Sequence, residues 1–130
     1  MPQAINLVLK NAAATNKTFE LIAPASGDGG VAQWALKEGT VSSVFPIVTA
    51  MAKATTNNSR QLRLKLRLPS SFTDTVTGRT LVSSGAEMNI TVSIPGDYPE
   101  SLKPDFAAFC KELLANALVN AMLKDAYPAT

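Results

Sequence analysis

Residues 61–68 alternate strictly between leucine and polar side chains. Leucine occupies every even position, and three of the four odd positions are cationic, namely Arg63, Lys65 and Arg67. Successive side chains of a β-strand point to opposite faces, so this segment would have a leucine face and a basic face. A helix would scatter both kinds of residue around its axis. We therefore predict a strand whose sheet has one face in a hydrophobic core and the other against water or an anionic ligand.

The rest of the first 94 residues is expected to form further short strands. Runs rich in β-branched and aromatic residues, separated by Asn-, Gly- and Pro-rich turns, are typical of such segments. The expected segments are a hairpin over 4–22 with strands 4–10 and 17–22, then an antiparallel sheet over 31–94 that includes strands 31–36, 44–55 and 87–94. Pro46 cannot donate a ladder hydrogen bond, which predicts a late start or a bulge. Residues 69–79 are expected to form a polar loop.

After residue 95 the apolar spacing changes to the i, i+3, i+4, i+7 pattern of an amphipathic helix. This helical segment covers 101–126, with Pro104 in the first turn, where its missing N–H would be unpaired anyway, and Pro128 beyond the end. Strands followed by a helical layer constitute an α+β fold. A chain of 130 residues has the size of one domain, so residues 1–130 are predicted to form a single domain.

The helical segment is too narrow for the predicted sheet. A helix of about 20 residues is ~30 Å long but only ~10 Å wide, whereas five strands spaced ~4.8 Å apart span more than ~20 Å. One helix therefore cannot cover the apolar face of its own sheet. The helix of a second copy is the simplest cover, which predicts an obligate homodimer.

The composition indicates the cellular setting. The single cysteine, Cys110, excludes an intrachain disulfide. The first residues lack the basic and apolar regions of a signal peptide. No apolar run approaches the ~20 residues of a membrane span. These features predict a cytoplasmic chain with no membrane partner.

The sequence offers little for catalysis. It has no histidine, which is the commonest general base and metal ligand, and with one cysteine the usual zinc sites are excluded. The glycine-rich run 27–30 precedes a strand rather than a helix, so it is not a phosphate-binding loop. Asp105 and Glu112 share a helical face, but solvated helix charges are the simpler interpretation. We expect no enzyme, no metal and no cofactor.

Charge is distributed unevenly along the chain. Residues 49–80 carry six basic side chains and one acidic one, whereas residues 97–125 carry five acidic and three basic ones. The polar faces of 49–55, 61–67 and 87–93 come from three strands that could be neighbours. Arginine and lysine neutralise phosphates, while Asn and Thr can hydrogen-bond base edges. The alternative is a solvated face whose charges maintain solubility.

The order of these elements resembles the coat proteins of single-stranded RNA bacteriophages (leviviruses). The resemblance rests on Gly30-Val-Ala-Gln-Trp34 after the N-terminal hairpin and on Met88-Asn-Ile-Thr-Val92 in the last strand. The first strand, Asn6-Leu-Val-Leu9, and the exit Leu66-Arg-Leu-Pro69 are also similar, and the helical tail ends near Tyr127. The resemblance covers nearly the whole chain in order and length.

The resemblance implies an N-terminal hairpin, a five-stranded antiparallel sheet and C-terminal helices that interlock across a homodimer. It further implies that dimers, assembled in the cytoplasm of a bacterial host, form the icosahedral capsid of a virion. The polar sheet face would lie inside against genomic RNA and would bind an operator hairpin to repress translation. Residues 71–82 would be a loop around the symmetry axes of the shell.

The resemblance also places particular residues on the RNA-facing surface. They are Thr49, Lys53, Thr55, Ser59, Gln61, Arg63, Lys65, Arg67, Asn89 and Thr91. This face has no aromatic side chain to stack on a base, and Arg67 adds a cation where a relative carries an acid. Both features favour phosphate contacts over recognition of one hairpin sequence. The alternative function is that of a dimeric RNA-binding regulator that forms no shell.

Overall fold

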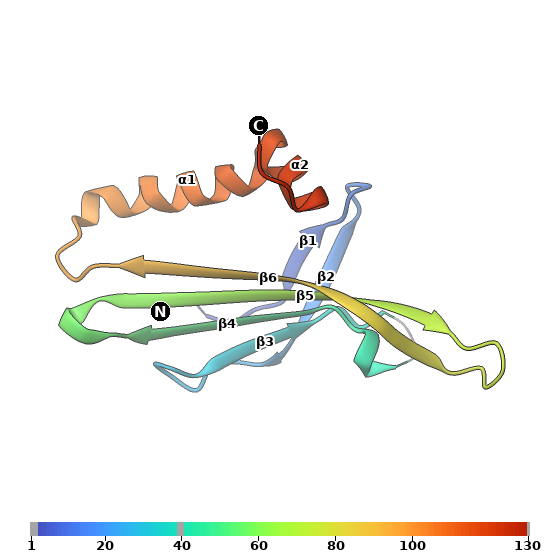
Figure 1. Cartoon of the computed structure of the whole chain (residues 1–130). Helices are drawn as coiled ribbons and strands as arrows, with labels where there is room; N and C mark the ends of the chain where they lie inside the picture. Colours follow the sequence, from blue (N-terminus) through green and yellow to red (C-terminus); the bar gives the residue numbers. More distant parts are fainter. Residues whose placement is uncertain (1–2, 39–40, 130) are drawn as a thin grey trace. The chain divides into compact units, whose positions relative to one another are not determined.

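A computed structural model describes residues 3–38 and 41–129 (Figure 1). The chain divides into two compact units, one up to Gly96 and one from Asp97 onward, and each is described by itself. The first unit is a six-stranded antiparallel sheet in which each strand pairs with the next along the chain. Its strands are β1 (Leu7–Lys10), β2 (Asn16–Ala23), β3 (Val31–Ala35), β4 (Ile47–Ala54), β5 (Arg60–Thr73) and β6 (Thr80–Ile94).

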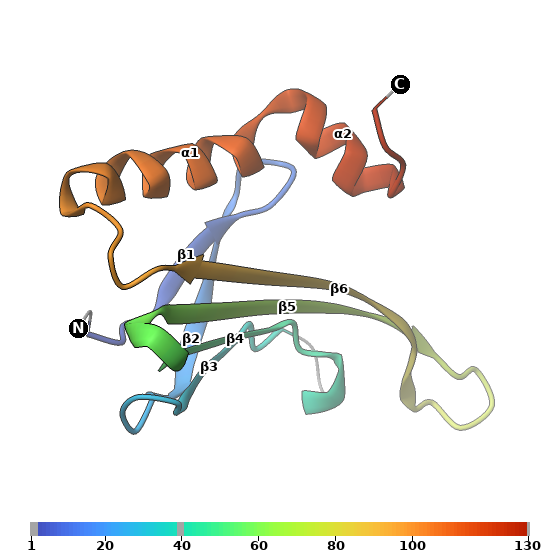
Figure 2. The same ribbon diagram turned by 60° about the vertical axis from the view of Figure 1, so that its left-hand side comes forward.

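The α+β class with an N-terminal hairpin, an antiparallel sheet and C-terminal helices is confirmed. The sheet differs from the five-stranded one expected: the hairpin strands β1 and β2 join the four strands β3 to β6 through the pairing of β2 with β3, which gives six strands. Ile22 has no partner in that pairing, since Leu21 faces Trp34 and Ala23 faces Gln33. A bulge of this kind bends the strand and increases its twist. Figures 1 and 2 show β1 and β2 turned steeply away from β4, β5 and β6.

The predicted alternation in β5 is confirmed by its pairing. Leu62, Leu64 and Leu66 lie opposite alanine or valine of β4 and apolar residues of β6, so these side chains share one face. The odd-numbered residues share the other face, as two-residue periodicity requires. Because the same alternation holds in all three central strands, each face is continuous across them.

The core of this unit lies where the hairpin meets the apolar face. Phe19, Ala32 and Trp34 form the buried cluster, and the partly buried residues packed against it are Leu7, Leu21, Leu36, Val48, Ala50 and Leu66. The indole Nε1 of Trp34 donates to the main-chain carbonyl of Ile5 at 2.7 Å. Buried tryptophan N–H groups usually find such a partner. This bond fastens the start of the chain to β3.

The structure corrects the predicted loop at 69–79 and the proposed loop at 71–82. β5 continues through Pro69 to Thr73, and β6 begins at Thr80, so residues 74–79 alone connect them. β4 begins at Ile47, opposite Arg67, so beyond that point β5 has a strand neighbour only in β6. Proline is tolerated in a strand with one free edge. The polar composition of residues 69–79 led to the prediction of a loop, whereas the ends of β5 and β6 form a regular two-stranded arm there.

The arm contains a β-bulge. Ser70 faces Ser84, but Ser71 faces Val82, which leaves Ser83 without a partner in the ladder. The hydroxyl of Ser83 lies 3.3 Å from the carbonyl oxygen of Ser70 and can donate to it. Such an extra residue bends the strand locally. The arm therefore changes direction near Ser83.

The prediction for the fourth strand is confirmed in its late start. A 3₁₀ turn, η1 (Ser42–Val44), and the buried Pro46 precede β4. A second 3₁₀ turn, η2 (Thr56–Asn58), joins β4 to β5, and Asn57 and Asn58 adopt φ of 63° and 58°. Asparagine tolerates this left-handed region better than most residues, which explains the Asn-Asn pair in the turn.

The second unit is helical. It comprises η3 (Glu100–Leu102), α1 (Lys103–Ala115) and α2 (Ala117–Asp125), with Pro104 in the first turn of α1 as predicted. The helical run bends by 58° between α1 and α2 (Figure 2). Asn116 sits in the bend in an extended conformation, and its Oδ1 accepts the Leu118 N–H at 2.9 Å. This side chain caps α2, so no proline is needed to break the helix.

The two helices carry several exposed large apolar side chains. No residue of α1 or α2 is buried, and Phe109 is 73% exposed. The other exposed large apolar residues of these helices are Leu113, Leu114, Leu118 and Leu123. Within the described residues, no single helix has the length and hydropathy of a membrane span, although the bent pair together meets the limits of length and composition.

Candidate nucleic-acid interface

The odd-numbered residues of the three central strands form one surface, called the polar face below. Cross-strand pairing places Thr49, Lys65 and Asn89 in one row of this face. Neighbouring rows join Met51, Arg63 and Thr91 on one side, and Ile47, Arg67 and Glu87 on the other. A further row joins Lys53, Gln61 and Ser93. Eight of the ten residues predicted for RNA contact are thus brought together by the ladder.

The remaining two predicted residues lie beyond the ends of the strands. Thr55 and Ser59 flank the η2 turn, and the Thr55 N–H donates to the Ser59 carbonyl at 2.7 Å. The hydroxyl of Thr55 also donates to this carbonyl, at 3.1 Å. Because the single hydroxyl hydrogen of Thr55 is donated to the Ser59 carbonyl, it is not available to a phosphate in this arrangement. Both residues nevertheless lie next to the Lys53 row.

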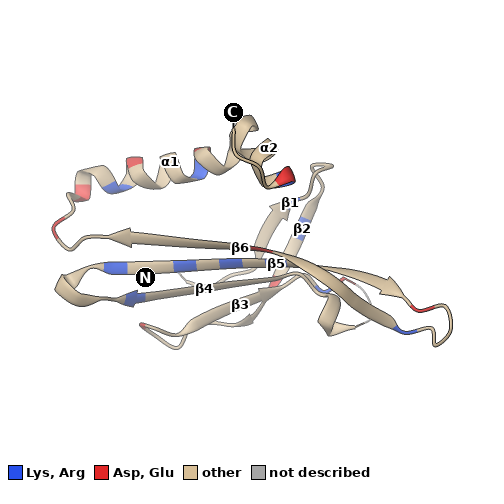
Figure 3. Cartoon of the chain, in the orientation of Figure 1, with Lys and Arg blue, Asp and Glu red and all other residues tan. Residues whose placement is uncertain are grey.

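The cations of the polar face follow one line along β5, with Lys53 on β4 beside them (Figure 3). Lys65 lies 3.4 Å from the carboxylate of Glu87. Within the described residues, Lys53, Arg63 and Arg67 have no ion pair. The pairing of Lys65 was not foreseen from the sequence, because its acid partner lies 22 positions away and comes close only through the β5–β6 register. Three cations on this face are therefore free to bind anions.

A shallow hollow of about 240 Å³ opens on the polar face. Its lining includes five predicted residues, which are Thr49, Arg63, Lys65, Asn89 and Thr91. Val31 and Met51 contribute apolar surface to the same hollow. Guanidinium, ammonium, amide and hydroxyl groups thus converge around a small apolar patch. Such a mixture can bind a phosphate group and the edge or face of a base.

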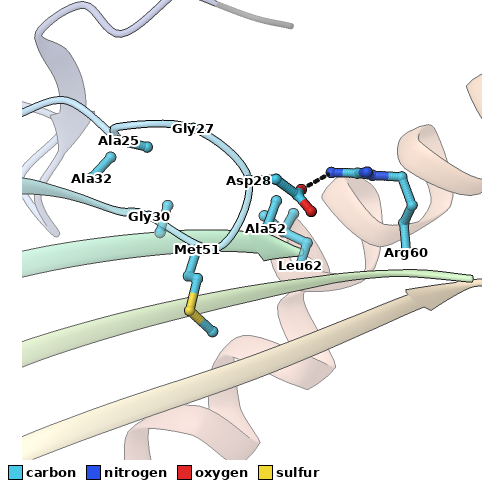
Figure 4. Close-up of a pocket in the computed structure, with 10 residues that line it drawn as sticks. Ala25, Gly27, Asp28, Gly30, Ala32, Met51, Ala52, Arg60 and Leu62 are labelled. Carbon is cyan, nitrogen blue, oxygen red and sulfur yellow. Dashed lines mark hydrogen bonds and ion pairs between the residues drawn. The ribbon is translucent and has the colours of Figure 1, made fainter. Parts of the chain in front are cut away.

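A second hollow, of about 650 Å³, involves the opposite face (Figure 4). It lies beside the loop between β2 and β3, and alanines 32, 50 and 52 together with Leu62 form much of its lining. Because alanine side chains are small, they leave open space above the sheet at these positions. Its two charged lining residues, Asp28 and Arg60, pair with each other, so the rest of the lining offers mainly apolar surface for packing.

Asp28 fastens the loop beside this hollow. Its Oδ2 accepts the Ala54 N–H at 3.0 Å, and its Oδ1 accepts from Nη2 of Arg60 at 2.6 Å (Figure 4). The hydrogen bond from the Ala54 backbone, followed by that from Arg60, lowers the pKa of Asp28 below its ordinary value. Gly29, with φ of 84°, donates its N–H to the Ala52 carbonyl at 2.8 Å. The loop thereby continues the pairing of β4 beyond the start of β3.

The described residues contain no group of three or more His, Cys, Asp or Glu side chains that could hold a metal ion.

The sequence interpretation missed residues near the polar face that are not on its strands. Ser42, Ser43 and Phe45 lie beside the Arg67 end of this face. No alternation marks them, because they precede β4 in a 3₁₀ turn and an extended residue.

The comparison with known protein families identifies the chain. A family profile described as "Levivirus coat protein" matches residues 2–129. The chain belongs to the levivirus coat protein family. It is therefore a capsid protein of an RNA phage and a component of the virion shell. The proteins of this family have a structural role.

Solved structures share the fold of this coat protein. The virus-like particle of bacteriophage NT-214 has a TM-score of 0.84 at 24% identity, covering 99% of this chain and 100% of the other. The virus-like particle of Beihai levi-like virus 21 has a TM-score of 0.85 at 18% identity and covers 99% of each chain. The capsid protein of bacteriophage GA has a TM-score of 0.70 at 24% identity and covers 95% of each chain. No curated protein sequence matches this coat protein significantly.

Proposed function

We propose that this coat protein assembles as homodimers into an icosahedral shell and that its polar face binds genomic RNA inside that shell. The observation that carries the RNA-binding proposal is the presence of three cations without ion pairs, Lys53, Arg63 and Arg67, on one continuous sheet face. Cations arranged in this way neutralise successive phosphates of a nucleic acid. Residues 1–130 would act as one coat-protein domain, assembled in the cytoplasm of the bacterial host.

The chemistry of the polar face favours contacts with the RNA backbone. Its rows contain arginine, lysine, amide and hydroxyl groups, but none of the paired positions of β4, β5 and β6 on this face is aromatic. Backbone contacts position the RNA without reading its sequence. Packaging of genomic RNA needs only these contacts, whereas translational repression through an operator hairpin requires base readout as well. Asn89, Thr91 and Thr49 are the residues we assign to such readout.

The homodimer is proposed from the large apolar side chains that the helical unit exposes and from the small number of buried hydrophobic residues. The helices α1 and α2 expose five large apolar side chains, led by Phe109, and have no buried residue. Only Phe19, Ala32, Trp34 and Ala35 are buried among the hydrophobic residues that the structure describes. A folded domain of this size normally buries most of its large apolar residues. Interlocking helices from two copies would supply the missing cover.

RNA binding is tested by replacing Arg63, Lys65 and Arg67 together with alanine. Particles of this variant should contain much less RNA, seen as a lower ratio of absorbance at 260 nm to that at 280 nm. The matched control replaces Lys103, Lys111 and Lys124 of the helical unit, which removes the same charge from residues outside the polar face. If the first variant packaged as much RNA at moderate salt as the control, the polar face would not be the RNA-binding surface.

Assembly is tested by electron microscopy of the purified protein. The proposal predicts closed shells, and Phe109→Asp together with Leu113→Asp should prevent them by placing charge in the proposed dimer contact. Glu112→Lys is the control, because it changes a charged residue of the same helix. Soluble dimers that bind RNA but never form shells would favour the alternative, a dimeric RNA-binding regulator.

A further inference from the structure

A separate hollow of about 400 Å³ lies at the Arg67 end of the polar face. Phe45, Ile47, Pro69 and Val82 give it apolar walls, and Ser42 and Ser43 contribute hydroxyl groups. Arg67 provides its one charged side chain. We call this hollow the Arg67 slot. It forms where η1 packs beside β5 and β6, at the point where the two-stranded arm begins.

The charge of Arg67 is available in this slot. Glu87 lies directly opposite Arg67 in the β5–β6 ladder, but its carboxylate is within 3.4 Å of Lys65 instead. The side chain of Arg67 extends past Gly85, where an added Cβ would lie 3.2 Å from the Arg67 Nε. Glycine at this position therefore leaves room for the guanidinium group to lie along the edge of the slot.

The composition of the slot matches the parts of a nucleotide. Apolar and aromatic walls can receive a base, a guanidinium group binds a phosphate as a fork of donors, and hydroxyl groups can bond a ribose or a base edge. A volume of about 400 Å³ also lies within the range of ~300–1,000 Å³ that is usual for small-molecule sites. A slot for phosphate alone would not need four apolar residues.

We infer that the Arg67 slot binds one unpaired nucleotide of single-stranded RNA, with its base between the apolar walls and its phosphate on Arg67. This inference rests on the proposed RNA-binding function and adds a base contact to it. Ile47 and Arg67 belong to the end row of the polar face, so RNA that follows the cations of β5 reaches the slot directly. A base in a duplex is stacked and paired, so the slot favours single strands.

The test uses the whole chain, as coat protein released from purified particles, and a variant that fills the slot without changing charge. Ser43→Leu adds apolar bulk to the slot lining. Ser84→Leu is the matched control, because Ser84 faces Ser70 on the opposite side of the sheet and does not line the slot. Each protein is titrated with a single-stranded oligouridylate and with an abasic oligomer that has the same number of phosphates.

We expect Ser43→Leu to weaken oligouridylate binding about tenfold, which is the low end of one base-stacking contact, and to leave abasic oligomer binding unchanged. Arg67→Ala should weaken binding of both oligomers. Equal affinities of Ser43→Leu and Ser84→Leu for oligouridylate would overturn the inference. This result is also expected if a neighbouring subunit, rather than a nucleotide, fills the slot.

The control for the underlying function is the Arg63→Ala, Lys65→Ala double variant. If it loses binding to both oligomers while Ser43→Leu behaves as the original protein, RNA binding stands and the slot assignment fails. If the original protein binds neither oligomer, the proposed RNA-binding function itself fails.

Discussion

The carboxylate of Glu87 lies 3.4 Å from the ammonium group of Lys65, although the ladder places Glu87 opposite Arg67. The acid therefore compensates one cation of the polar face and leaves the arginine free. Both side chains of the pair are about half exposed, so the pair itself adds little to stability. Its main effect is on the charge that the face presents to RNA.

Replacing Glu87 with glutamine should strengthen RNA binding. The change releases Lys65 for a phosphate contact, and each contact with single-stranded RNA adds about 0.7 to the slope of log affinity against log salt concentration. Affinity titrations between 50 and 200 mM salt, which are ~fourfold apart, measure this slope. Glu112→Gln, which removes an acid from α1, should leave it unchanged. A slope identical to that of the original protein would contradict the release of Lys65 for a new phosphate contact.

Acid should loosen the loop that Asp28 fastens. Folding lowers the pKa of Asp28 below 3.8, because the charged carboxylate accepts hydrogen bonds from Ala54 and Arg60. The unfolded chain therefore binds protons more readily, so this contribution to stability is complete above pH 3.8 and is lost as the pH falls through the lower, folded-state pKa. The expected result is a loss of urea resistance below that pH that is smaller in Asp28→Asn than in the original protein.

Asp74 must be separated from this effect. The Val76 N–H hydrogen-bonds the Asp74 carboxylate and lowers the pKa of Asp74, so its contribution has the same sign and pH range. Asp74→Asn should therefore remove a part of the acid sensitivity independently of Asp28→Asn, because the two sites share no partner. Identical acid sensitivity in the original protein and in the double variant would show that neither carboxylate is responsible.

Trp34→Phe tests the attachment of the chain start to β3. The phenylalanine keeps most of the packing with Phe19 but removes the hydrogen bond to the Ile5 carbonyl, which should cost about 1 kcal/mol of unfolding free energy. Trp34→Ala should cost about 3–5 kcal/mol because it also leaves a cavity. Denaturant unfolding at one fixed protein concentration gives both values, since assembly makes stability concentration-dependent. Unchanged stability of Trp34→Phe would contradict a role for the hydrogen bond, and equal losses in the two variants would contradict the cavity contribution.

Asn116→Ala tests the break between the helices. The substitution removes the cap on the Leu118 N–H and should cost about 1 kcal/mol, whereas Asn116→Ser keeps an oxygen acceptor and should cost less. Thermal unfolding of the three proteins at equal concentration provides the measurement. If alanine and serine were equivalent at this position, the bend would have to arise from contacts other than the cap.

The strictly alternating segments made much of the central sheet predictable. Leucine at every second position of β5 set its two faces, and Met88 to Val92 set those of β6, so the residues of the polar face could be predicted. Which of them lie opposite one another could not be predicted, because register depends on long-range pairing. Pro69 and the serines beside it resemble a loop in sequence, yet they form strand where β5 has one free edge. The break between the helices was not predicted either, because no proline marks it. It depends on the hydrogen bond from the Leu118 N–H to Asn116 Oδ1.

The bulge at Ser83 also determines how the arm tolerates changes in length. Because Ser83 has no partner in the ladder, its deletion would leave all pairs from Thr73–Thr80 to Arg60–Ile94 intact. Loss of a residue away from the bulge, within 85–94, would shift one part of the strand by one position and exchange its two faces. Ser83 is therefore the position where β6 can lose a residue without changing partners. Such a deletion would straighten the arm and move its tip, so the reach of the arm can change while the sheet keeps its pairing.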